Sequence, residues 1–102
     1  MTHFYRVLAD ETRRKILALT AQREYTQAEL VSLFDVSQPA IKKHLDLLLK
    51  EQLLHERKEG RYRYYKLHLD NFKDKKAEVE QELNQILKQK LVDLKSYLEE
   101  GY

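Results

Sequence analysis

The sequence predicts a mainly helical α+β fold for a chain of 102 residues. Apolar side chains recur every three or four positions over most of the chain, which is the spacing of an amphipathic helix. Two β-prone segments that flank Gly60 break this period between residues 54 and 68, and the period returns from Asp70 for roughly 30 residues. We therefore expect four helices, one β-hairpin and one long C-terminal helix, in that order, within one domain of ordinary size.

The first two helices are expected over residues 2–9 and 11–22. Apolar side chains at helical spacing indicate the first helix. Asp10 belongs to the residue types that cap helix N-termini, and it directly precedes the second helix. The apolar positions of the second helix form its expected buried stripe, namely Ile16, Leu17 and Leu19. Its basic positions form the expected outer face, namely Arg13, Arg14 and Lys15.

The next two helices are expected over residues 27–34 and 38–51, joined by a tight turn at residues 35–36. Thr26 and Glu29 have the spacing of a capping box, in which each side chain bonds the other residue's backbone N–H. Ser37 is a typical N-cap for the fourth helix, and Pro39 is tolerated in its first turn. The third helix is expected to turn three apolar residues inward: Leu30, Leu33 and Phe34. The corresponding residues of the fourth helix are Ile41, Leu45, Leu48 and Leu49.

The remaining residues predict the hairpin and the last helix. Residues 54–58 and 62–68 are the expected strands, and Gly60 is the expected tip between them. The order of elements is that of a winged helix-turn-helix, with a two-stranded wing and a long C-terminal dimerisation helix. We assign residues 1–69 to the winged helix-turn-helix domain and residues 70–102 to the dimerisation helix, as parts of one compact unit.

The helix that begins after Ser37 is expected to enter the major groove of a DNA duplex. Residues 37–66 carry 8 basic and 4 acidic side chains, so the positive charge is concentrated there. Gln38 can pair with adenine, and Lys42 or Lys43 can reach guanine. The alternative is an ordinary amphipathic helix with a solvated polar face, which the neighbouring short helix, tight turn and hairpin disfavour. The predicted DNA contacts of this helix are Ser37, Gln38, Pro39, Lys42, Lys43 and His44.

The hairpin is expected to supply a second DNA contact. Arg61 follows Gly60 at the tip, where it can enter a minor groove or bind a phosphate. Tyr62 is the tyrosine expected to contact the DNA backbone. Tyr65 has the spacing of the inward residue Leu67, so a packing role is expected for it.

Three segments resemble the ArsR-type winged-helix repressors of bacteria. Residues 8–17 (LADETRRKIL) are similar to the family's LADPTRRKIL opening, residues 37–45 (SQPAIKKHL) to its recognition helix, and residues 59–67 (EGRYRYYKL) to its wing. The resemblance covers about residues 4–69. It implies a homodimer that represses transcription by binding an inverted-repeat operator. Glu11 and Arg63 depart from the family's usual Pro and apolar residue, and Arg63 puts the packing of the wing in doubt.

No metal, cofactor or catalytic site is predicted. The chain has no Cys. Residues 24–30 correspond to the segment in which arsenic- and cadmium-sensing members carry a thiolate pair, and that pair is therefore absent. No His follows His68, so the His/Asp pattern of the family's zinc site is also absent. The four histidines are far apart and have no metal-ligand spacing; they are His3, His44, His55 and His68. No phosphate loop or nucleophile pattern occurs, so we expect no enzyme.

The long last helix predicts a homodimer. A helix of 30 residues spans about 45 Å, which is too long for one small domain to cover. The alternative is a protein-interaction module that docks another protein through this helix. The sequence has no secretory signal and no apolar run that could span a bilayer, so we expect a cytoplasmic, nucleoid-associated protein. The sequence does not identify an inducer. The expected dimer interface comprises Phe4, Tyr5, Leu8, Val79, Leu83, Ile86, Leu87 and Leu94.

Overall fold

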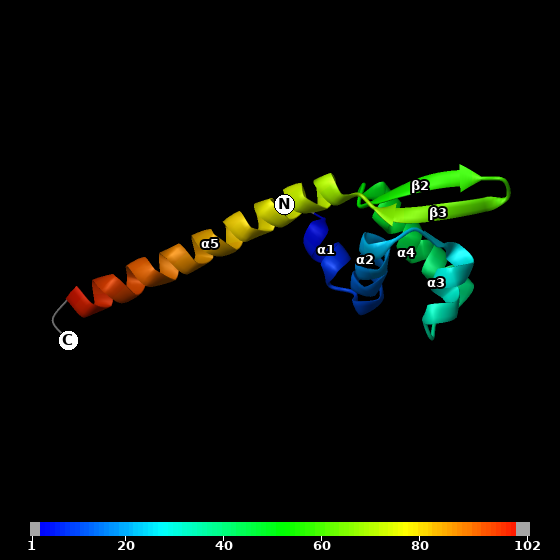
Figure 1. The fold of residues 1–102 in the computed structure, drawn as a ribbon. Coiled ribbons are helices and arrows are strands. Elements are labelled where there is room, and N and C mark those ends of the chain that lie inside the picture. Colours follow the sequence, from blue (N-terminus) through cyan, green and yellow to red (C-terminus); the bar gives the residue numbers. More distant parts are fainter. Residues whose placement is uncertain (1–2, 100–102) are drawn as a thin grey trace. The chain divides into compact units, whose positions relative to one another are not determined.

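The computed structural model describes residues 3–99, except for the side chains of residues 92–94 and 97. It divides into two units, residues 1–72 and 73–102. In the first unit, helices α2, α3 and α4 pack against the hairpin of strands β2 and β3 (Figure 1). The prediction of a mainly helical winged helix-turn-helix is confirmed. The elements are α1 (Phe4–Leu8), α2 (Glu11–Gln22), β1 (Tyr25–Thr26), α3 (Gln27–Leu33), α4 (Gln38–Lys50), β2 (Leu54–Glu59), β3 (Tyr62–Leu67) and α5 (Leu69–Glu99).

The three predicted N-caps begin their helices as expected. The Asp10 carboxylate accepts a hydrogen bond from the backbone N–H of Arg13 at 3.0 Å, at the start of α2. Thr26 and Glu29 form the reciprocal capping box of α3, with bonds of 3.1 Å and 2.9 Å. These bonds satisfy N–H groups that have no partner within the helix, and so they fix where α2 and α3 begin.

The core of the first unit joins all of its helices to the sheet. Its fully buried apolar side chains come from α1 to α4 and from the segment before β2; they are Val7, Ile16, Leu30, Ile41, Leu45, Leu48 and Leu53. Four predicted core positions differ. Leu19, Phe34 and Leu49 are only half-buried, and Leu33 is 56% exposed, because α3 ends there and the chain turns away before a further turn can cover it.

The sheet has a third strand that the sequence did not predict. Strand β1 pairs with β3, so the strand order is β1-β3-β2, and Tyr25 lies opposite Tyr65 while Thr26 lies opposite Tyr64. Two residues are too few to show the alternation that identifies a strand. The pairing brings the first turn of α3 beside the wing.

Arg13 and Arg14 do not form the free outer face expected of them. Arg13 donates to the carbonyl oxygens of Val7 at 3.1 Å and Arg6 at 2.7 Å, and Arg14 donates to that of Leu8. The last carbonyls of a helix lack partners within it. Both guanidinium groups therefore close the C-terminal end of α1 and join it to α2.

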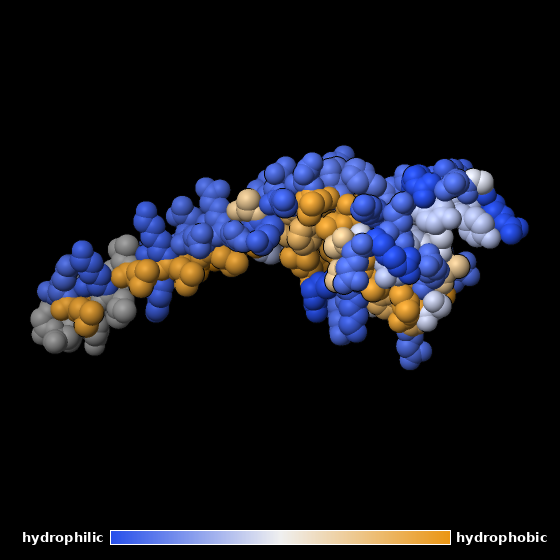
Figure 2. Space-filling model, viewed as in Figure 1, coloured by the Kyte–Doolittle hydropathy of each residue, from blue (hydrophilic) through white to orange (hydrophobic). Residues whose placement is uncertain are grey.

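The second unit is the continuation of α5 beyond Phe72. Figure 2 shows apolar side chains gathered along one side of this helix. No described helix of the chain is long and apolar enough to cross a membrane. Among the described side chains of the unit, the exposed large apolar ones are Leu83, Ile86, Leu87, Leu91 and Leu98, each between 48% and 66% exposed.

Candidate nucleic-acid interface

Helix α4 presents a polar face at its N-terminal end. The Ser37 hydroxyl accepts from the backbone N–H of Ala40 at 3.3 Å and caps the helix. Ile41, Leu45 and Leu48 hold the opposite face in the core, with at most 1% exposure. The helix is thereby fixed on one side only, and its solvent-facing side chains include Gln38, Pro39, Lys42 and Lys43, all four of them predicted DNA contacts.

The two lysines of this face differ in their surroundings. The Lys42 ammonium lies 3.2 Å from the Asp46 carboxylate, one helical turn away. Both side chains are about 60% exposed, and an ion pair this exposed contributes little stability. Lys42 can therefore exchange Asp46 for a phosphate or a base edge. Among the described contacts, Lys43 has no carboxylate partner, so its charge is open to an anion.

His44 does not share this exposed face. Its side chain is only 19% exposed, and its Nδ1 accepts from the Arg13 guanidinium at 3.3 Å. Its Nε2 lies 4.0 Å from the Asp10 carboxylate. The ring thus joins α4 to the capped start of α2, and most of its surface is covered, unlike those of Gln38 and Lys42.

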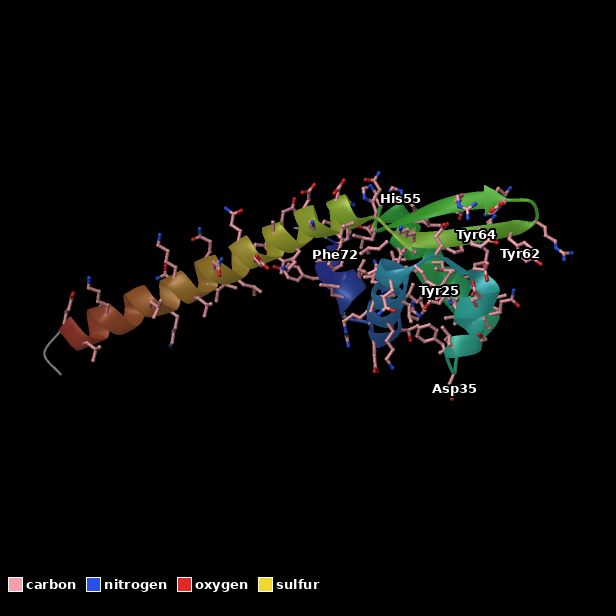
Figure 3. All side chains as sticks on the ribbon, in the orientation of Figure 1. Tyr25, Asp35, His55, Tyr62, Tyr64 and Phe72 are labelled. Carbon is pink, nitrogen blue, oxygen red and sulfur yellow. The ribbon has the colours of Figure 1, made fainter. Side chains whose placement is uncertain are left out.

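The tip of the wing carries an exposed cation and an exposed ring. Gly60 has a φ of +61°, a left-handed backbone conformation that favours glycine over residues with a side chain. The Arg61 guanidinium lies 3.3 Å from the Tyr62 hydroxyl and 5.3 Å from the centre of its ring. Tyr62 is 49% exposed, and Figure 3 shows it near the hairpin end, away from Tyr25 in the body of the unit.

Arg57 of β2 is held between two carboxylates. Arg57 donates to the Glu24 carboxylate at 3.0 Å and 3.4 Å and to the Glu59 carboxylate at 2.6 Å. These hydrogen bonds raise the pKa of Arg57 above its ordinary value, and the bond to Glu24 has the larger effect. Its guanidinium also lies 4.5 Å from the centre of the Tyr64 ring. Arg57 therefore fastens β2 to the loop between α2 and β1.

Arg63 and Tyr65 lie two residues apart on the same side of β3. Arg63 pairs with Glu56 at 3.5 Å and remains exposed, so the unusual cation causes no burial cost. Tyr65 is buried, as its spacing predicted. Burial, and secondly the nearby Glu56 carboxylate, raises the pKa of its hydroxyl.

A polar hollow of about 260 Å³ opens between α3, α4 and the wing. Gln27 and Arg63 belong to it and were not predicted as site residues. Gln27 and Arg63 come close together because β1 pairs with β3. Only a prediction of strand β1 could therefore have identified them as neighbours. The lining residues are Thr26, Gln27, Ala28, Gln38, Arg61, Tyr62, Arg63 and Tyr65.

The residues expected at a dimer interface have different exposures. Phe4 is 2% exposed and contacts the Phe72 ring edge-to-face, with ring centres 5.4 Å apart, so it belongs to the core of the first unit. Tyr5, Leu8 and Val79 are half-buried. The side chain of Leu94 lies outside the described residues. The other three predicted residues, Leu83, Ile86 and Leu87, are exposed.

No group of three or more potential metal ligands occurs among the described residues. His55 and His68, which are 13 residues apart in the sequence, stack on each other with ring centres 4.1 Å apart.

Comparison with known proteins identifies relatives of this chain. The family model described as "Bacterial regulatory protein, arsR family" matches residues 10–56. The transcriptional repressor SdpR of Bacillus subtilis is 30% identical over 74 residues, which cover 72% of this chain and 82% of that protein. The arsenical resistance operon repressor of Escherichia coli is 41% identical over 64 residues, covering 62% of this chain but only 55% of the repressor.

Solved structures of relatives share the fold. An ArsR-like transcriptional regulator from Rhodococcus sp. RHA1 superposes with a TM-score of 0.78 and 26% identity, over 97% of this chain and 90% of that one. A possible transcriptional regulator for arsenical resistance gives a TM-score of 0.73 and 30% identity, over 87% and 97% of the two chains. This chain therefore belongs to the ArsR family of bacterial regulatory proteins, which are DNA-binding winged helix-turn-helix regulators of transcription and not enzymes.

Proposed function

We propose that this protein represses transcription as a homodimer that binds an inverted-repeat operator, with α4 of each copy in a major groove. The observation that carries the proposal is the exposed polar face of α4, which is fixed from behind by three core residues and flanked by a basic wing tip. A capped helix that presents amides and ammonium groups outward is suited to reading base edges.

Base readout is assigned to the N-terminal turns of α4. Gln38 can bond adenine through two atoms, and Lys42 or Lys43 can donate to guanine O6 and N7. Pro39 offers an apolar surface to a thymine methyl. Ser37, at the start of the helix, is assigned to the phosphate beside these bases. His44 is left out of this surface because its ring is engaged by Arg13 and lies near Asp10.

The wing tip and the polar hollow are assigned to the DNA backbone. Arg61 and Tyr62 lie at the tip, where a hairpin can follow the minor groove. The hollow joins two arginines, Arg61 and Arg63, to the amides of Gln27 and Gln38. Donors of this kind bind phosphate oxygens and hold a protein in register on the duplex.

The exposed stripe of α5 is assigned to a second copy of the chain. Leucine and isoleucine side chains this exposed along one side of a helix remain in water unless a partner covers them. Two-fold symmetry then places two α4 helices about 34–36 Å apart, which is one turn of DNA. We assign residues 1–69 to DNA binding and residues 70–102 to dimerisation, with Tyr5, Leu8, Val79, Leu83, Ile86, Leu87 and Leu94 at the interface.

Selection of bound sequences from random duplexes tests the proposal as a whole. We expect enrichment of a palindromic site whose half-sites lie one helical turn apart. Recovery of no preferred sequence would reject sequence-specific binding, and recovery of an asymmetric site would reject the symmetric dimer. A chain that binds no duplex but binds another protein through α5 would favour the protein-interaction module instead.

A salt titration tests the assigned cations individually. We expect Lys42→Ala and Arg61→Ala each to weaken duplex binding and to reduce the slope of log K against log salt by about one unit, because each loses one phosphate or base contact. The matched control is Lys50→Ala, which removes an exposed lysine from the other end of α4. Unchanged affinity and slope in both test variants would contradict the assignment, as would an equal loss in the control.

A further inference from the structure

The end of α4 and the beginning of α5 are joined through two side chains, His68 and Asn71. The backbone N–H of Asn71 donates to Nδ1 of His68 at 3.2 Å, so the imidazole caps α5. The Asn71 side-chain amide donates to the carbonyl oxygens of Gln52 at 2.6 Å and Glu51 at 3.3 Å. His68 also donates its backbone N–H to Leu53 at 2.9 Å.

Asn71 supports a strained backbone conformation. Helix α4 ends in a Schellman motif, in which the N–H groups of Gln52 and Leu53 return to the carbonyls of Leu49 and Leu48 at 3.0 Å and 2.9 Å. The left-handed position of this motif usually holds glycine, but here Gln52 has a φ of +59°. Such a conformation persists only where its surroundings hold it. The two bonds from Asn71 provide that support.

The cap of α5 depends on an unprotonated nitrogen. Because Nδ1 of His68 accepts the Asn71 N–H, the imidazole carries its proton on Nε2. A second proton on Nδ1 removes the acceptor and places a positive charge at a helix N-terminus, where cations are unfavourable. The His55 ring stacks on that of His68 with centres 4.1 Å apart and planes 20° apart. Protonation of both rings would therefore bring two like charges together. Figure 3 shows His55 at the end of β2 that is next to the start of α5.

The other charged groups around this junction are few. Lys66 lies opposite His55 in the strand register, Glu51 follows α4, and Asp70 lies in the first turn of α5. None of these three forms an ion pair with either imidazole among the described contacts. Asp70 partly offsets a positive charge at this helix end, whereas Lys66 adds to the repulsion at His55.

We propose that the His68–Asn71 junction is a proton-sensitive brace, which holds the end of the DNA-reading helix α4 to the start of α5 and releases it when His68 is protonated. The proposal rests on the proposed DNA-binding function. Because α5 is continuous from Leu69 to Glu99, the brace also connects α4 to the helix assigned to dimerisation. Histidine is the side chain that ordinarily changes charge between about pH 5 and 8, which sets the pH range of the test.

Two measurements on the full chain and its His68→Asn variant test the brace. Asparagine is a good N-cap that does not titrate, so the variant keeps the cap at every pH. The probe is the best duplex recovered from the random selection. Between pH 7.5 and 5.5 we expect wild-type affinity to fall by about fivefold relative to the variant, the ratio that one lost helix cap carries. Added positive charge alone would strengthen binding to DNA, so weakening has the opposite sign to a general charge effect.

Hydrogen exchange provides a readout that does not depend on DNA. Protection of the Asn71 amide should fall at pH 5.5 in the wild type and persist in His68→Asn, measured against the Phe72 amide, which donates to a backbone carbonyl. Identical pH profiles of the two proteins in both measurements would overturn the brace while leaving DNA binding intact. If no duplex is recovered, the proposed function fails, and the exchange measurement alone decides whether the junction senses protons.

Discussion

Asp10 begins α2 and also lies near the two residues that join α2 to its neighbours. Its carboxylate accepts the Arg13 N–H, and this hydrogen bond, more than the nearby His44 and Arg13 charges, holds the pKa of Asp10 below its ordinary value of 3.8. A lowered carboxyl pKa means that folding favours the ionised form. The stabilisation is therefore complete above the ordinary pKa and is lost as the pH falls through the lower pKa of the folded state.

Replacement of Asp10 should show this dependence. We expect Asp10→Ala to lower the free energy of unfolding at pH 7 by about 1 kcal/mol, the usual value of an N-cap. The deficit should shrink as the pH falls below 3.8 and through the lower pKa of the folded state, where the wild-type carboxylate becomes protonated. Urea denaturation at pH 7 and pH 3 measures both values. Asp35→Ala, at an exposed acidic residue in the turn before α4, is the control, and an equal deficit in it would remove the cap as the cause.

The roles of residues that bond close neighbours in the sequence were predicted better than the roles of residues that contact other elements. Thr26, Glu29 and Ser37 were identified as caps because a cap depends on spacing along the chain. The roles of Arg13 and His44 were not, because both side chains reach other helices, and helical spacing cannot show which helix lies across from a polar position. Phe4 was assigned to an interface between copies, since no local pattern shows that Phe72 covers it within the same unit.

At the scale of elements, α4 owes its position to one apolar stripe. Ile41, Leu45 and Leu48 recur at helical spacing and are essentially unexposed, which is why this helix was predicted correctly. Leu33 illustrates the limit of the same argument. It follows the spacing of α3 but lies in the last turn, where no neighbouring element covers it. The strand β1 was missed for a related reason, since its existence depends on β3, about 40 residues away.

Truncation of the α4 stripe should affect the whole first unit. We expect Leu48→Ala to lower the free energy of unfolding by about 3 kcal/mol, because it leaves a cavity in a packed core. Leu33→Ala removes the same atoms from a side chain that is 56% exposed, and a change within about 0.5 kcal/mol is expected. Thermal or urea unfolding of the two variants compares them directly. Equal losses would mean that α3 ends in a covered site after all.

At the scale of the whole molecule, the apolar stripe of α5 matters most. Leu83, Ile86 and Leu87 are exposed in the single chain, in contrast to the well-buried stripe of α4. The sequence predicted α5 and its stripe because a long uninterrupted period is the strongest pattern that a sequence contains. The surface that covers the stripe depends on a second molecule, which is why the dimer remains a proposal.

A charge placed in the stripe should separate the proposed dimer. We expect Leu87→Glu to give the mass of one chain in sedimentation equilibrium at micromolar concentration, because burying an unpaired carboxylate is costly. Loss of the second α4 should weaken operator binding by about a hundredfold or more. Gln85→Glu adds the same charge on the opposite side of α5 and should change neither property. A dimeric Leu87→Glu protein would place the contact between copies elsewhere.

The ion pairs that anchor the wing do not include Arg61, the residue at its tip. Arg57 pairs with Glu24 and Glu59, and Arg63 pairs with Glu56, and these contacts hold the hairpin in place. Arg61 at the tip takes no part in this anchoring. The charge of the tip can therefore change while these contacts stay the same. A substitution at Arg61 therefore changes the charge of the wing tip without removing the contacts that keep the hairpin in place.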